Sequence, residues 1–156
     1  MQKRWLVDRL EASSAEVKFI MTSVPISDPG KDKWGDYAEE RDEILDFIEK
    51  QGITGVAFLA TDVHHAAIAK IPGPVRLKEF IFGPLAAPMN YMINSEEPRF
   101  EYFNDHYRNY GKVTIHSESS APIMKIEWFG EGNVLLHHVV LSTDSSGNLV
   151  SVDPEK

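Results

Sequence analysis

The chain contains no cysteine among its 156 residues, and it contains no long apolar run. The first absence excludes disulfides, thiolate metal ligands and a cysteine nucleophile. The second excludes a membrane-spanning helix, which needs roughly 20 consecutive apolar residues. The start of the chain also lacks the continuous apolar segment of a secretory signal peptide. We therefore expect no membrane partner, and a cytoplasmic location if Met1 is the true start.

Basic residues are also few. Lysine and arginine number 16 against 24 aspartates and glutamates, which gives a formal net charge of −8. A protein that follows a nucleic-acid backbone needs a basic face, so this balance argues against nucleic acid as a partner. It leaves open a small phosphorylated substrate, whose charge a bound metal could neutralise.

Hydrophobic residues make up 42% of the chain and charged residues 26%, which is ordinary for a soluble globular domain. Apolar residues at helical spacing predict a helix over residues 2–13. The apolar stretch 17–24 predicts a strand, and the proline, glycine and aspartate content of 25–35 predicts a loop. Residues 53–60 predict the next strand.

A second helix is predicted between these two strands. Asp36 can cap it, and Glu39, three residues on, completes a capping-box pattern. Apolar and long side chains from Tyr37 to Ile48 form one stripe, and Gly52 ends the helix. The order strand, helix, strand indicates a βαβ unit with parallel strands.

The second half of the chain predicts mainly strands. The four predicted strands are 77–82, 112–117, 123–129 and 134–141. Residues 86–112 are expected to be irregular and rich in aromatic side chains, and 130–133 form a hairpin turn. The polar tail 142–156 is expected to be loosely held.

The segment Thr61-Asp-Val-His-His65 follows a predicted parallel strand, at the edge where open α/β sheets bind their ligands. In an extended segment, residues i and i+2 project to the same side, so Asp62 and His64 would share one pocket and His65 would face away or flank it. A carboxylate with an imidazole suits iron, manganese, zinc or a mixed pair that includes calcium. A polar loop without a ligand is the alternative.

Six sequence blocks occur in a particular order along the chain. They are QKRWLVDRL from Gln2, KFIMTSVP from Lys18, WGDYAEER from Trp34, TDVHHA from Thr61, EFIFGPL from Glu79, and YGKV from Tyr110 with a closing hairpin. In this order they resemble the C-terminal part of the alkaline phosphatase D-like family of metallophosphatases, within the metallophosphoesterase superfamily. The resemblance runs to about Leu141. One departure is Thr61, where the family usually has glycine.

The resemblance implies an α/β fold, a partial metallophosphoesterase-type sheet sandwich with flanking helices that ends in antiparallel strands. Residues 1–141 would be the C-terminal portion of the metallophosphatase domain, and 142–156 a tail. The resemblance also implies a site: Asp62 and His64 would bind metal, His65 would be catalytic, and the substrate side would comprise Ser23, Trp34, Tyr37 and Arg41.

The early metal-binding motifs of the superfamily, an Asp-x-His followed by Gly-Asp and Gly-Asn-His, are absent from this sequence. We therefore expect the C-terminal half of a metal-dependent phosphomonoesterase or phosphodiesterase, which acts on a phosphate ester and is inactive alone. Iron, calcium, manganese or zinc would occupy the complete site and bind this chain weakly or not at all. The expected partner is the missing N-terminal half or a second copy in a homodimer. The alternative is a non-catalytic remnant or interaction module that keeps the fold.

Overall fold

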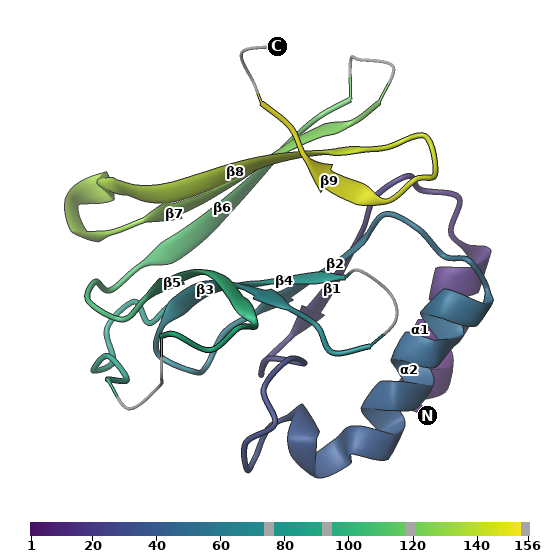
Figure 1. Cartoon of the computed structure of the whole chain (residues 1–156), viewed down its shortest axis with the longest axis horizontal. Helices are drawn as coiled ribbons and strands as arrows, with labels where there is room; N and C mark the ends of the chain where they lie inside the picture. The colour runs from purple at the N-terminus through teal and green to yellow at the C-terminus, as the bar shows by residue number, and fades with distance from the viewer. Residues whose placement is uncertain (74–76, 92–94, 118–120, 154–156) are drawn as a thin grey trace.

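The computed structural model describes residues 1–73, 77–91, 95–117 and 121–153. Two helices, a five-stranded sheet and a four-stranded sheet form three layers (Figure 1). The helices are α1 (Gln2–Ala12) and α2 (Ala38–Lys50), with 3₁₀ turns η1 (Trp34–Tyr37) and η2 (Glu131–Asn133). The strands are β1 (Lys18–Thr22), β2 (Val56–Ala60), β3 (Ala66–Lys70), β4 (Lys78–Ile81), β5 (Phe100–Asn104), β6 (Tyr110–His116), β7 (Ile123–Phe129), β8 (Leu135–Thr143) and β9 (Leu149–Ser151). Within the described ranges, no helix is both long and apolar enough to cross a membrane.

The predicted βαβ unit is confirmed. The five-stranded sheet has the order β1-β2-β4-β3-β5, and β1, β2 and β4 run parallel. Strand β3 is antiparallel to both of its neighbours. The strand predicted from Ile53 begins at Val56, because a tight turn precedes it. Gly55 there has φ +69°, and a Cβ atom at this position would lie 1.8 Å from the Glu16 carbonyl oxygen, so only glycine fits.

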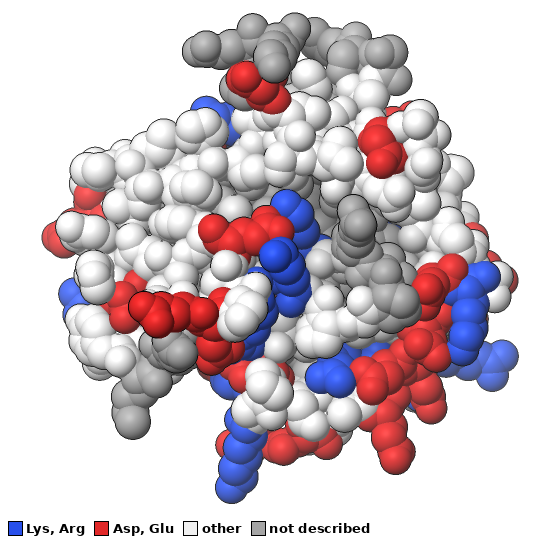
Figure 2. Space-filling model, in the orientation of Figure 1, with Lys and Arg blue, Asp and Glu red and all other residues white. Residues whose placement is uncertain are grey.

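The apolar stripe of α2 packs on one face of this sheet. Ile44, Leu45 and Ile48 are buried against a core that includes Val56 and Phe58 of β2. Figure 2 shows that charged side chains of both signs gather over the helical layer, at the lower right of the view. The predicted amphipathic helix is therefore confirmed.

The two ends of α2 differ in how well the sequence predicted them. The predicted end is confirmed, since Gly52 follows the last turn with φ +61°. The predicted capping box is wrong, because η1 leads directly into α2 and Tyr37 occupies the N-cap position without a side-chain cap. The Asp36 carboxylate instead accepts a hydrogen bond from the backbone N–H of Asp32, at 2.8 Å.

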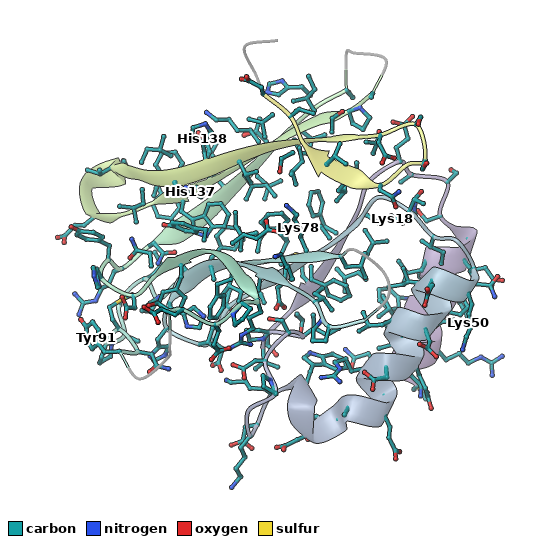
Figure 3. All side chains as sticks on the ribbon, viewed as in Figure 1. Lys18, Lys50, Lys78, Tyr91, His137 and His138 are labelled. Carbon is teal, nitrogen blue, oxygen red and sulfur yellow. The ribbon has the colours of Figure 1, made fainter. Side chains whose placement is uncertain are left out.

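The second core lies between the two sheets. Trp128 of β7 is fully buried there, and its indole N–H donates to the carbonyl oxygen of Ile81 at 2.8 Å. His137 of β8 stacks on Tyr102 with ring centroids 3.9 Å apart, on the side of the strand that faces the five-stranded sheet (Figure 3). His138 points to the opposite side, as strand alternation predicts.

Three strands were not predicted. Strand β3 is the alanine-rich AAIAK, which has weak intrinsic strand preference, and β5 lies within the region expected to be irregular. The tail is not loosely held throughout, because β9 pairs with β8 and the Val152 N–H donates to the Val140 carbonyl oxygen at 2.9 Å. The region predicted to be irregular, 86–112, includes residues 92–94, and the predicted tail, 142–156, includes residues 154–156. Both of these short segments lie outside the described residues.

Candidate functional site

The loop after β2 lies at the carboxyl end of the parallel strands, as expected. Its backbone is not extended, however: Asp62 and His64 have φ values of +74° and +60°, in the left-handed region. The predicted extended segment, in which residues i and i+2 would project to the same side, is therefore wrong here. Thr61 stands where the family usually has glycine. The φ angle of Thr61 is not positive, so a residue with a side chain is tolerated at this position.

Asp62 and His64 nevertheless line one pocket, of about 410 Å³. The left-handed backbone conformation brings the two side chains to the same pocket. An extended backbone was expected to do this. A backbone hydrogen bond of 3.0 Å from the Asn90 N–H to the His64 carbonyl oxygen ties the loop to the opposite wall. The remaining lining residues are Asp28, Lys33, Val63, Pro88, Met89 and Asn90.

The partner of Asp62 in this pocket is Lys33, which the sequence analysis missed. Its Nζ lies 2.5 Å from the Asp62 Oδ2. The lysine comes from the loop before η1, 29 residues earlier in the chain, and no local pattern links it to Asp62. The ammonium group therefore offsets the charge of the carboxylate at the mouth of the pocket.

The residues present do not suffice for a metal centre. Asp62 and His64 are suitable donors, but within the described ranges no group of three or more histidine, aspartate or glutamate side chains converges. An ammonium group also occupies one side of the Asp62 carboxylate. Two donors do not fix a catalytic metal ion, so further ligands would have to come from outside the residues that the structure describes.

His65 lies in the core and does not line this pocket. Its ring packs against those of Phe100 and Phe103, with centroids 5.8 Å and 4.9 Å away, and its Nδ1 lies 3.1 Å from the Val63 carbonyl oxygen. Burial disfavours the charged imidazolium and lowers the pKa of His65 to about 4. The catalytic role expected for His65 remains a prediction, and this buried position disfavours it.

The four residues expected on the substrate side are divided. Ser23, Trp34 and Tyr37 line a second groove, of about 840 Å³, and Lys33 lines both this groove and the pocket. The indole N–H of Trp34 donates to the Thr22 hydroxyl at 3.1 Å. Arg41 is not part of either lining, since its Nε donates to the Asp42 carboxylate at 2.8 Å.

A buried glutamate fixes one wall of the pocket. Glu79 of β4 is fully buried, and its carboxylate accepts hydrogen bonds from the backbone N–H groups of Ile26 at 2.7 Å and Ser27 at 3.1 Å. Arg99 donates to the Ser27 carbonyl oxygen at 2.9 Å. Burial raises the pKa of Glu79, while the two N–H donors oppose that rise. The sequence signal was a glutamate inside the apolar strand EFIF.

Comparisons with known proteins identify a matching family, a similar sequence and a similar fold. A family model described as PhoD-like phosphatase matches residues 1–143. The alkaline phosphatase D of Bacillus subtilis (strain 168) is 24% identical over 141 residues, which covers 73% of this chain and 24% of that protein. A solved structure titled "Structure of PhoD" has a TM-score of 0.73 at 18% identity, and the match covers 97% of this chain and 34% of the solved chain.

The structural likeness confirms the predicted partial sheet sandwich. The chain spans about a quarter of the length of the curated relative and about a third of the solved chain.

Proposed function

Because this chain belongs to the PhoD-like phosphatase family, we propose that it supplies the C-terminal half of a metal-dependent phosphomonoesterase or phosphodiesterase. The observation that carries the proposal is the shared pocket of Asp62 and His64 at the carboxyl end of the parallel strands. Ligand sites of open α/β sheets lie at this edge. The substrate class is a phosphate ester.

In this proposal Asp62 and His64 are two of the ligands of a multinuclear centre that holds iron, calcium, manganese or zinc. Such a centre polarises phosphoryl oxygens and supplies the attacking hydroxide when it is complete. Lys33 forms an ion pair with the Asp62 carboxylate and competes with a metal ion for it. Glu79 holds the backbone of the loop that presents Asp28 to the pocket.

The substrate would lie where the pocket and the groove meet. Lys33 borders both spaces, and Ser23, Trp34 and Tyr37 line the groove beside it. The Trp34 ring, anchored through Thr22, offers a face on which an organic leaving group can stack. Arg41 would contact phosphate only after its hydrogen bond to the Asp42 carboxylate breaks.

One observation favours the second candidate, a non-catalytic module that keeps the fold. The Lys33 ammonium already satisfies the Asp62 carboxylate, and among the described residues no group of three donors converges, although Asp28 lines the same pocket. A chain with this arrangement could retain the family fold without its chemistry. The two candidates differ in whether the pocket binds a metal ion at all.

Calorimetric titration of the chain with Mn²⁺ and with Zn²⁺ distinguishes them. We expect weak binding, at best in the micromolar range, that His64→Ala abolishes. His138→Ala is the matched control, because His138 lies on β8, outside the pocket lining, and its replacement leaves the titration unchanged. No binding by the unmodified chain, or binding that survives His64→Ala, would count against the proposed site.

A further inference from the structure

Strand β1 forms one end of the five-stranded sheet, and β2 is its one neighbour among the described strands. The two strands are parallel with Lys18 opposite Val56, and the Lys18 N–H donates to the Gly55 carbonyl oxygen at 2.8 Å. Alternate residues of a strand direct their main-chain groups to opposite sides. Lys18, Ile20 and Thr22 therefore face β2, and the N–H and C=O groups of Phe19 and Met21 face the open side.

The 840 Å³ groove runs along this open side. Its lining includes eight consecutive residues, from Val17 to Val24. A groove over a sheet face would be lined by every second residue, because successive side chains point to opposite faces. A continuous run indicates that the groove follows the edge of the strand. Its walls come from α1, through Trp5 and Leu6, and from η1.

Large apolar side chains around the groove are exposed. Met21 is 81% exposed, Tyr37 64% and Trp5 58%. An unpaired strand edge recruits other strands, and an apolar patch beside it adds side-chain contacts to the main-chain hydrogen bonds. The combination is the arrangement that proteins use to bind an extended segment by adding it to a sheet.

We propose that the β1 edge binds an extended strand from the part of the PhoD-like fold that lies outside residues 1–156. The match to the solved relative covers 97% of this chain but only 34% of the solved chain, so about two thirds of the solved chain lies outside the unit that the two share. The groove also shares Lys33 with the Asp62 pocket, and Ser23, beyond the carboxyl end of β1, lines the groove. A strand paired with β1 therefore ends beside the pocket that needs further ligands.

The test uses the chain and, as a separate polypeptide, the part of the Bacillus subtilis alkaline phosphatase D outside the region that this chain matches. Calorimetry measures binding, and amide hydrogen exchange locates it. We expect binding that slows exchange of the Phe19 and Met21 amides by at least about tenfold, since both become hydrogen-bonded. Slowed exchange along β5, β6 or β9 with β1 unchanged would overturn the proposal, as would no binding at roughly 100 µM.

Two variants of one residue separate main-chain pairing from side-chain contact. Met21→Pro removes an N–H that faces the open side and leaves the bonds to β2, and Met21→Lys places a charge on the edge. Each is expected to weaken binding by about tenfold or more, whereas Ile115→Lys, at a half-exposed position on β6, leaves it unchanged. If circular dichroism shows that Met21→Pro is unfolded, Met21→Lys and the hydrogen-exchange pattern still test whether a strand binds at the β1 edge.

A complex in which two copies of this chain stay paired through β1 while the relative's segment binds elsewhere would also overturn the proposal. The inference rests on the proposed function in one respect: both require a second segment of the PhoD-like fold, outside residues 1–156. All readouts are made without metal, so a failure here is distinct from a failure of the Asp62 and His64 assignment, which the His64→Ala titration tests.

Discussion

Lys33 and Asp62 form an ion pair across the pocket, with the Lys33 Nζ 2.5 Å from the Asp62 Oδ2. The lysine side chain is largely buried, at 18% exposed. The pair joins the loop before η1 to the loop after β2, two segments that lie far apart in the sequence. Any cation that binds through Asp62 must therefore compete with the lysine ammonium.

Removal of this ammonium is expected to strengthen metal binding. In Lys33→Met the apolar stem remains and the charge is lost, so the affinity for Mn²⁺ should rise by about tenfold, equivalent to about 1.4 kcal/mol. Calorimetric titration measures the change. Lys50→Met is the control, because Lys50 pairs with Asp46 on the solvent face of α2. An unchanged or lower affinity in Lys33→Met would show that the ion pair does not compete with metal.

The chain alone is expected to lack phosphatase activity, since two donors do not hold a catalytic metal centre. With added iron, calcium, manganese or zinc, p-nitrophenyl phosphate and its bis-ester should remain intact. Colorimetric release of nitrophenolate is the measurement. Turnover above roughly 1 s⁻¹ that His64→Ala removes would contradict this prediction.

Glu79→Gln is expected to lower the free energy of unfolding by about 2 kcal/mol. The amide can accept from only one of the two N–H groups of Ile26 and Ser27, which leaves a buried donor unpaired. Urea denaturation measures the loss. Glu101→Gln, the same substitution on β5, alters an ion pair with Lys78 and should cost less than about 1 kcal/mol. Equal losses in both variants would argue against a special role for Glu79.

The stability of the two-sheet core should depend on pH through His137. Burial first, and the neighbouring His138 second, hold the pKa of His137 below its ordinary value of 6.5. The unfolded chain therefore takes up the proton at higher pH than the folded chain does. The stabilising contribution is full above about pH 6.5 and falls as the pH is lowered below that value.

His137→Phe keeps a ring to stack on Tyr102 and removes this titration. Urea denaturation at about pH 7.5 and about pH 5 should show a smaller loss of stability on acidification for this variant than for the unmodified chain. His138→Phe serves as the control on the exposed side of β8. Identical pH dependence in the unmodified chain and His137→Phe would exclude His137 as the source.

By itself the chain is expected to associate with its own copies at micromolar concentration. The open edge of β1 and the exposed Met21 and Trp5 offer a surface for antiparallel pairing of two copies about a twofold axis. Light scattering should report a dimer that Met21→Lys reduces to a monomer. A well-folded monomer at the same concentration would favour a self-sufficient module.

Local sequence patterns determined the first part of the fold. The stripe from Tyr37 to Ile48 and the stop at Gly52 identify α2, because helix periodicity and the left-handed glycine are properties of neighbouring residues. Two apolar segments on either side of a helix then imply parallel strands. The place of Asp62 and His64 at the carboxyl end of β2 follows from that topology alone.

Tertiary structure decided what depends on residues that are distant in the sequence. The alanine-rich β3 is a strand because β4 and β5 pair with it on both sides, and its own residues favour that state only weakly. The contacts of Lys33 with Asp62 and of Glu79 with Ile26 join segments 29 and 53 residues apart. Such contacts form only when the sheet aligns the loops, so no periodicity in the sequence encodes them.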